Sequence, residues 1–530
     1  MLIFASKGEE QAMQTSNLSR RGFLLQTGLA ALAPAGLAAL ALPCRTLYAA
    51  TSPTTVRTPN GILRGELSGN ARVFRGVRFA EPPIGPLRFR APVKARRWQG
   101  ERDATRFGAS AMQPGEPGIE HSEDCLTLNL WAPQGKGPFP VYVWVHGGGF
   151  TSGRAFEPMY DGTALAQAGV LCITVAYRLG VFGFLDMEPL LGPSYADSAN
   201  NGLRDLITAL EWVQENVAAF GGDPTRVTVG GESAGAKLTD TLLGVSSAQS
   251  LFQQAISESG GAERVATRAD SSAVARGFGE EWRTRTGGEL LSLQTAPADA
   301  LIQVQHEFLR RWPQHFPLRA EIEGSLLPHR PVETIAGGAS RGKRLLIGTN
   351  RDESALFIGP HPSHDPGAGD MGNLSPAKFS EVFSKYRTVY PQMTDEALRI
   401  RSLTAEEYWI PSMRVADAHV KGGGKAWMYR LDFAEASGRL AGAAFHSLDV
   451  QLVWNRPSTL VANATAEAQL AVEMSQAWIA FLRGEAPGAP GLPAWPEYSS
   501  DARPTMVFDA QCRVEPAPQE AELRLWDVVL

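Results

Sequence analysis

Residues 227–236 read VTVGGESAGA, in which Gly231, Ser233 and Gly235 form the pattern Gly-x-Ser-x-Gly. The β-branched residues before the pattern favour a strand, and the alanine-rich residues after it favour a helix. A serine at such a junction is typical of a nucleophile elbow. The serine takes a strained conformation there, and side chains in place of the glycines would collide where strand and helix close together. The stretch therefore predicts a serine nucleophile on an α/β fold.

The same pattern occurs a second time, at Gly338, Ser340 and Gly342. This serine precedes its apolar run instead of following it, so it would lie at the wrong edge of a sheet. The stretch also nearly matches a phosphate-binding loop, but Arg344 stands where a metal-binding Ser or Thr is needed, and the strand follows the loop. We therefore interpret Ser340 as part of a turn.

Strand-like and helix-like segments alternate along the chain. Apolar residues at intervals of three and four predict a helix over residues 202–220. This alternation is typical of a mainly parallel sheet with helices on both faces, in which ligands bind at the carboxyl ends of the strands. The segments expected to be buried strands are residues 141–145, 170–176, 227–229, 345–348 and 427–433.

The organisation of the chain predicts a signal followed by one domain. The motifs are spread over most of the sequence, which favours a single domain over residues 51–530. Residues 262–340 and 355–425 are more helical and polar, and we expect them to form cap segments over the site.

The net charge is −5, with Lys and Arg scattered singly, so no basic surface for nucleic acid is expected.

Residues 1–50 are typical of a secretion signal. Arg20 and Arg21 precede an apolar run, and small residues follow near a possible cleavage site at Ala49 or Ala50. This order predicts a twin-arginine signal peptide and a periplasmic or secreted mature chain. The alternative is a transmembrane anchor, which the shortness of the run and its proline and glycine disfavour. We expect no membrane association after export.

A glycine run that could bind an oxyanion occurs in HGGGF at 146–150, directly after a predicted strand. Backbone amides without side chains can point at a developing negative charge there. His146 itself is expected to be structural, because the base follows the serine in hydrolases of this chain order.

The acid and the base are expected after Ser233. The predicted strand at 345–348 leads into a loop that carries Asp352 and Glu353, and spacing does not choose between these two carboxylates. Four histidines follow, and position favours His446, which comes after the last strong strand and a loop of small residues. His419 lies in a helical run whose face looks solvated. The remaining two, in a Pro/Gly-rich loop, are His361 and His364.

Short motifs occur along the chain in one order: FRGVRFAEPPIGPLRF at 74–89, SEDCLTLN at 122–129, HGGGF at 146–150, YRLG at 177–180, NGLRD at 201–205, FGGDP at 220–224, GESAG at 231–235, GTNRDE at 348–353, AFH at 444–446 and WPEY at 495–498. With these motifs the chain resembles the type B carboxylesterase family, the cholinesterase-like branch of the α/β-hydrolases. The resemblance covers most of residues 55–510. It implies the α/β-hydrolase fold and the hydrolysis of carboxylic esters.

The resemblance also implies the residues of the site. The catalytic triad falls on Ser233, His446 and Glu353. The oxyanion-hole amides fall on Gly148, Gly149 and Ala234. Supporting polar positions around the triad fall on Glu232 and Ser259. Two structural ion pairs fall on Arg88 with Glu123 and on Arg178 with Asp205.

Two departures from the family pattern bear on the substrate and on disulfides. The usual disulfide partner of Cys125 is replaced by Ala111, so we expect that disulfide to be absent. Choline-binding members carry an indole between these two positions, which binds quaternary ammonium through its π face. Residues 113–122 contain no aromatic side chain, so a choline ester is disfavoured.

The implied reaction is ester hydrolysis through an acyl-serine intermediate, with a small-molecule ester as partner and neither metal nor cofactor. One alternative is a non-catalytic binding or adhesion protein on the same fold, which the intact triad positions disfavour. The other is an amidase or lipase that uses the same triad.

Overall fold

The computed structural model describes residues 54–358, 374–456 and 464–527. The predicted signal peptide at 1–50 and two of the candidate bases, His361 and His364, lie outside these residues.

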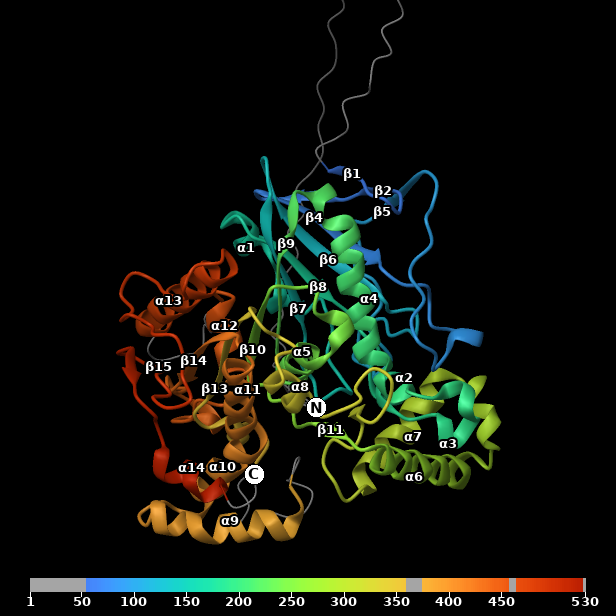
Figure 1. Cartoon of the computed structure of the whole chain (residues 1–530). Helices are drawn as coiled ribbons and strands as arrows, with labels where there is room; N and C mark the ends of the chain where they lie inside the picture. The colour runs from blue at the N-terminus through green and yellow to red at the C-terminus, as the bar shows by residue number, and fades with distance from the viewer. Residues whose placement is uncertain (1–53, 359–373, 457–463, 528–530) are drawn as a thin grey trace, which may run out of the picture. The chain divides into compact units, whose positions relative to one another are not determined.

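Within these described ranges, eleven strands form the central sheet. In chain order they are β3 (Glu66–Ser68), β4 (Ala71–Arg78), β6 (Thr127–Pro133), β7 (Phe139–Val145), β8 (Leu171–Val175), β9 (Gly222–Glu232), β10 (Gln254–Glu258), β13 (Arg344–Asn350), β14 (Lys425–Leu431), β15 (Thr505–Phe508) and β16 (Arg513–Glu515). Their order across the sheet is β16-β15-β14-β13-β10-β9-β7-β8-β6-β4-β3. The strands between β15 and β4 are labelled in Figure 1. Neighbours from β15 through to β8 are parallel, and the strands outside this block pair antiparallel. The predicted α/β class with a mostly parallel sheet is confirmed.

Helices and two small sheets complete the described chain. The helices are α1 (Thr163–Gln167), α2 (Gly180–Phe184), α3 (Glu188–Leu191), α4 (Asn201–Asn216), α5 (Ala234–Gly244), α6 (Arg268–Thr286), α7 (Ala298–Arg311), α8 (Pro331–Ala336), α9 (Pro376–Val389), α10 (Asp395–Thr404), α11 (Ile410–Lys421), α12 (Leu448–Val453), α13 (Ala464–Leu482) and α14 (Glu520–Trp526). The small sheets pair β1 (Thr55–Arg57), β2 (Ile62–Arg64) and β5 (Glu101–Asp103), and separately β11 (Val265–Ala266) with β12 (Ala320–Glu321).

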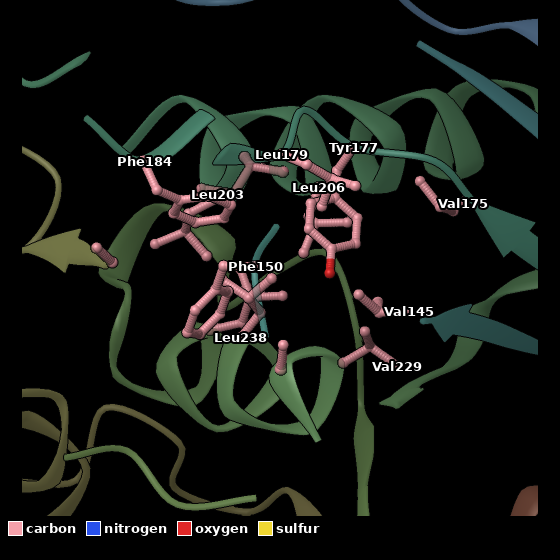
Figure 2. Close-up of a cluster of buried hydrophobic side chains, with 14 of the residues drawn as sticks. Val145, Phe150, Val175, Tyr177, Leu179, Phe184, Leu203, Leu206, Val229 and Leu238 are labelled. Atoms are coloured by element: carbon pink, nitrogen blue, oxygen red, sulfur yellow. The ribbon is translucent and has the colours of Figure 1, made fainter. Parts of the chain in front are cut away.

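The two faces of the sheet have separate cores, because side chains alternate between the faces of a strand. On β7, Val143 and Val145 belong to the core that includes apolar side chains of α4 and α5, whereas Tyr142 and Trp144 belong to the core that includes α12 and α13. Figure 2 shows part of the first core, with Val145, Val175 and Val229 from the strands, Leu203 and Leu206 from α4, and Leu238 from α5. This packing fixes α5 against β9 and so fixes the turn between them.

The segments at 262–340 and 355–425, which were expected to be caps, contain the helices α6 to α11. In the first, α6 packs against α7, and α8 packs against α5 and α11. In the second, α9 packs against α10 and against α14 from the end of the chain (Figure 1). A single turn of π-helix at Ala405–Trp409 joins α10 to α11. Such π-turns often occur at functional sites.

The parallel block brings the ends of β7, β9, β10 and β13 to one edge of the sheet. Val145 pairs with Gly231, Glu232 pairs with Glu258, and Glu258 pairs with Gly348. The loops that carry HGGGF, Ser233, Ser259 and Glu353 begin within a few residues of these pairs. They therefore emerge side by side, although they are far apart in the sequence.

Candidate active site

Ser233 lies between β9 and α5, where its backbone has φ 56° and ψ −122°. A non-glycine residue is strained in this region and stays there only when its surroundings hold it. Its N–H donates to the carbonyl oxygen of Glu258 at 2.9 Å, which ties the turn to β10. Within the three described ranges, the Ser233 hydroxyl forms no hydrogen bond, so it is available to a ligand.

Gly231 and Gly235 allow β7 to approach the elbow closely. A Cβ added to Gly231 would lie 2.4 Å from the carbonyl oxygen of Val145, and one added to Gly235 would lie 2.0 Å from the same atom. Both distances are far shorter than any van der Waals contact. A side chain at either position would therefore push the strand and the elbow apart, as the sequence pattern indicated.

Glu353 and His446 are hydrogen-bonded to each other. Oε2 of Glu353 lies 2.6 Å from Nδ1 of His446. The other carboxylate oxygen accepts from Ser259 Oγ at 2.5 Å and from the Asn350 N–H at 2.7 Å. Burial raises the pKa of Glu353, and these two hydrogen bonds act in the opposite direction because they stabilise the carboxylate.

Asp352, the competing carboxylate, points elsewhere. Its Oδ2 accepts from Arg351 Nε at 2.9 Å and from the Ala444 N–H at 3.0 Å. Its side chain remains 24% exposed, whereas that of Glu353 is fully buried. The geometry therefore separates two neighbours that the loop sequence left equivalent.

His446 is buried among further acids and an aromatic ring. Its Nε2 lies 3.1 Å from Oε1 of Glu232, which also accepts a hydrogen bond from Ser447 Oγ. The ring of Tyr408, from the π-turn, packs 4.7 Å from the imidazole. Burial lowers the pKa of His446, while Glu232 and Asp449 raise it. The base is therefore neutral at rest and has carboxylates nearby to stabilise its protonated form.

The glycine run forms a loop with free amides. Gly148 and Gly149 have φ values of 113° and 61°, which glycine adopts without strain. Ala234 is the first residue of α5, so its N–H has no partner within the helix. In the described part of the chain none of these three amides donates a hydrogen bond. They are free to bind a negative oxygen next to Ser233.

His146, the first residue of HGGGF, contacts the backbone of this loop. Its Nδ1 lies 2.8 Å from the carbonyl oxygen of Gly147, and its ring stacks on that of Tyr177 at 4.6 Å. Burial lowers the pKa of His146 to about 4, so the ring is neutral. These contacts agree with the structural role expected for it.

The expected solvation of His419 is wrong. His419 lies on α11, as the helical pattern predicted, but it is fully buried. Its Nδ1 lies 2.8 Å from Ser340 Oγ, and its Nε2 lies 3.1 Å from the carbonyl oxygen of Lys343. The second Gly-x-Ser-x-Gly serine thus has a histidine partner, but both side chains are enclosed in the core. This pair joins a turn to a helix and is closed to substrate.

Both predicted ion pairs are present, and Cys125 is unpaired. Arg88 Nε donates to Glu123 at 2.8 Å. In the core, Arg178 donates two side-chain hydrogen bonds to Asp205, at 2.6 and 2.8 Å. Cys125 is a free, buried thiol beside Ala111.

Sequence reasoning missed Asp449 and Tyr408. Asp449 accepts hydrogen bonds from Tyr429 Oη at 2.7 Å and from Asn350 Nδ2 at 3.1 Å. Its negative charge raises the pKa of His446. Its position three residues after His446 was a usable signal. Tyr408 lies far from the triad in the sequence, and no local pattern marks it.

The described residues contain no group of three or more His, Cys, Asp or Glu side chains placed to hold a metal ion. In the same part of the chain, no helix is both long enough and apolar enough to span a membrane.

Comparisons with known proteins found one matching family and several similar proteins. The model of the carboxylesterase family matches residues 52–526. The para-nitrobenzyl esterase of Bacillus subtilis (strain 168) is 34% identical over 484 residues, covering 88% of this chain and 96% of that protein. The fumonisin B1 esterase of Sphingopyxis macrogoltabida is 33% identical over 485 residues, covering 87% of each chain.

Solved structures show the same similarity. A para-nitrobenzyl esterase structure superposes with a TM-score of 0.79 at 32% identity, covering 89% of this chain and all of that one. A carboxylesterase of Geobacillus stearothermophilus matches with the same TM-score, identity and coverage.

Proposed function

Because the chain belongs to the carboxylesterase family and is therefore a carboxylic ester hydrolase, we propose that Ser233, His446 and Glu353 perform the hydrolysis. The observation that carries this proposal is the 2.6 Å contact between His446 and Glu353, at the sheet edge where Ser233 occupies its strained elbow. The free amides beside Ser233 support the same assignment.

The reaction follows from these positions. Nε2 of His446 takes the Ser233 proton as Oγ attacks the ester carbonyl, and the amides of Gly148, Gly149 and Ala234 bind the resulting oxyanion. The imidazolium then protonates the departing alcohol, which leaves an acyl-serine. Water repeats the sequence and releases the acid. Glu353 keeps the proton on Nδ1, so that Nε2 is the basic nitrogen.

In this scheme, Glu232 and the reacting Ser233 hydroxyl both contact the same atom, Nε2 of His446. The 3.1 Å contact between Nε2 and Glu232 Oε1 has to give way to Ser233 Oγ when substrate binds. Catalytic hydrogen bonds often tighten only in the substrate complex, and the two side chains are chain neighbours, so a small movement is sufficient. Burial raises the pKa of Glu232, and the nearby His446 is the largest opposing effect, because its positive form stabilises the carboxylate.

Labelling with a fluorophosphonate tests the nucleophile directly. The probe reacts with an activated serine hydroxyl, so we expect one covalent adduct, on the peptide that contains Ser233, identified by mass spectrometry. The exclusion of Ser340 from solvent predicts no adduct there. An adduct on Ser340, or none on Ser233, would contradict the assignment.

A para-nitrophenyl ester series from acetate to long chains, beside matched anilides, separates an esterase from a lipase or an amidase.

Glu232→Gln is expected to shift the acidic limb of the pH profile of kcat/KM to lower pH. Glu232 raises the pKa of His446, and the base acts only when neutral, so removing this charge lets it remain neutral in more acidic solution. We also expect kcat to fall on the order of 10-fold, since the imidazolium loses a charged partner. Profiles are measured with a para-nitrophenyl ester.

Glu232→Asp retains the charge and is the matched control. Its acidic limb should stay near that of the unchanged enzyme. A limb that does not move in Glu232→Gln would mean that Glu232 does not act on the base.

We also propose export by the twin-arginine route to the periplasm or beyond, based on the order of parts in residues 1–50. Fused to a reporter that requires folded export, residues 1–55 should deliver it across the membrane. Changing Arg20 and Arg21 together to Lys should abolish this delivery while leaving expression unchanged. Delivery that survives the double change would indicate another route.

A further inference from the structure

Lys237 is a buried lysine one turn after Ser233. It lies on α5, where its N–H donates to the carbonyl oxygen of Ser233 at 2.9 Å, and it is only 3% exposed. A lysine is rarely buried so completely unless its ammonium is paired. The Gly-x-Ser-x-Gly pattern does not require a lysine at this place, so its role has to come from the groups that it contacts.

Three acceptors surround the side-chain nitrogen of Lys237. Nζ donates to the carbonyl oxygens of Gly260 and Glu407, both at 2.9 Å. It also forms an ion pair with Oε1 of Glu407 at 3.1 Å. Only an ammonium has three N–H groups, so only the protonated form satisfies all three acceptors at once. Burial lowers the pKa of Lys237, and these acceptors oppose it because they stabilise the charged form.

The partners of Lys237 belong to segments that contact the triad. Gly260 directly follows the serine that donates to the triad acid. Glu407 lies in the π-turn and directly precedes Tyr408, whose ring packs 4.7 Å from the imidazole of His446. Nζ of Lys237 also lies 4.9 Å from the centre of the Tyr408 ring. One side chain therefore joins α5 to the segment behind the acid and to the segment against the base.

The π-turn has a specific need for this contact. In a regular helix the carbonyl oxygen of Glu407 would accept from the N–H of the residue at 411, but that residue is Pro411, which has no N–H. A buried carbonyl oxygen that loses its helical donor needs another one. Nζ of Lys237 is such a donor. Lys237 therefore binds the π-turn at the point where the helical hydrogen-bond pattern is interrupted.

We infer that Lys237 is a positioning residue, whose ammonium fastens the π-turn to α5 so that Tyr408 holds the imidazole of His446 in its orientation toward Ser233. Proton transfer needs the base within hydrogen-bond reach of the serine hydroxyl, and a small misplacement of the ring lowers the rate. This inference rests on the proposed catalytic role of Ser233 and His446.

The charges around His446 make the role of Lys237 visible in a pH profile. Burial lowers the pKa of His446, nearby carboxylates raise it, and nearby cations lower it. The carboxylates are Glu232, Glu353 and Asp449, and the cations are Lys237 and Arg264. Without the charge of Lys237, the base becomes protonated at a higher pH. The acidic limb of kcat/KM then moves to higher pH, opposite to the shift expected for Glu232→Gln.

A double-mutant cycle tests whether Lys237 acts through Tyr408. The four enzymes are the unchanged chain, Lys237→Met, Tyr408→Leu and the double variant, and kcat is measured with a para-nitrophenyl ester. We expect Lys237→Met to lower kcat by about 10- to 100-fold. The double variant should lose no more than the more impaired single variant, because Lys237 then has no ring to position. Losses that multiply in the double variant would overturn the inference.

The pH profile and a conservative variant give a second test. Lys237→Met should move the acidic limb of kcat/KM to higher pH. Lys237→Arg retains a positive charge and several donors, so its limb should stay near that of the unchanged enzyme and part of kcat should return. A limb that stays in place in Lys237→Met would overturn the inference, as would a Lys237→Arg variant no better than Lys237→Met.

Lys343→Met is the matched control. Lys343 is also a buried lysine, and its Nζ donates to the carbonyl oxygens of Gln249 and Phe252 and lies 4.3 Å from the centre of the Phe252 ring. None of these groups contacts the triad. Lys343→Met should therefore lower the temperature of unfolding but leave kcat within a few fold and the acidic limb unchanged. Equal losses of kcat in Lys343→Met and Lys237→Met would show general destabilisation and overturn the inference.

Folding is checked by circular dichroism. In Lys237→Met, Glu407 retains its ion pair with Arg264, so its charge is not left alone. If this variant still does not fold, Lys237→Gln, which removes the charge but retains a donor, takes its place in both tests.

Labelling separates this inference from the proposed function. In the unchanged enzyme, a fluorophosphonate adduct on Ser233 together with unchanged kcat in folded Lys237→Met would overturn the role of Lys237 and leave the catalytic serine intact. No adduct on Ser233 in the unchanged enzyme would instead overturn the proposed catalytic serine.

Discussion

Ser233→Ala is expected to lower kcat for a para-nitrophenyl ester by about 10⁴- to 10⁶-fold, because the covalent route through an acyl-serine is lost. The oxyanion amides remain, so a small residual rate over water is expected. The fold should be retained, since alanine at φ 56° carries the same kind of strain as serine and the hydroxyl holds no hydrogen bond among the described residues. Steady-state kinetics and a thermal unfolding curve measure both effects.

Ser340→Ala is the matched control, because Ser340 lies in the same sequence pattern. It should leave kcat nearly unchanged. It should also lower stability by about 1–3 kcal/mol, since Nδ1 of the buried His419 loses the hydroxyl 2.8 Å away. If Ser233→Ala kept its activity while Ser340→Ala lost it, the assignment of the nucleophile would be wrong.

Glu353→Gln is expected to lower kcat by about 10⁴-fold. An amide in this position can donate a hydrogen bond to Nδ1 of His446, which moves the proton of the neutral imidazole to Nε2. The nitrogen that should accept the Ser233 proton is then already protonated. The side chain is nearly the same size, and Ser259 and Asn350 can still donate to its oxygen, so little change in stability is expected.

Asp352→Asn provides the comparison for this second prediction. Asp352 contacts Arg351 and the Ala444 backbone outside the buried site, so we expect kcat to change by less than about 10-fold. Equal losses in Asp352→Asn and Glu353→Gln would indicate that the loop as a whole, and not the Glu353 carboxylate, sustains the reaction.

Much of the fold was predictable because it depends on local features of the chain. Runs of β-branched and apolar residues marked β7, β8, β9, β13 and β14, although the predicted ranges 170–176 and 427–433 extend one or two residues beyond β8 and β14. The three-and-four spacing marked α4 with the short 3₁₀ turn after it. The elbow was predictable for the same reason. Gly231 and Gly235 are needed because a side chain at either position would clash with the carbonyl oxygen of Val145. This need for glycine is visible within a stretch of ten residues.

The site was predictable only in part. Residue types and chain order gave Ser233, left Asp352 and Glu353 equivalent and favoured His446, and the family resemblance was needed to choose. For His419, the spacing of polar residues suggested a solvated face. The spacing contains no information on the turn carrying Ser340, which covers the face of α11 that carries His419.

The sequence by itself therefore determined the strand order along the chain, the elbow and the glycine loop, because each expresses the conformational limits of neighbouring residues. The tertiary structure alone decided that Tyr408 packs on His446 and that His419 is buried against Ser340, and it gave the contact by which Glu353 reaches His446. These relations join segments that meet only when parallel strands align their carboxyl ends. Distances and burial between such segments arise from packing, which local sequence patterns do not encode.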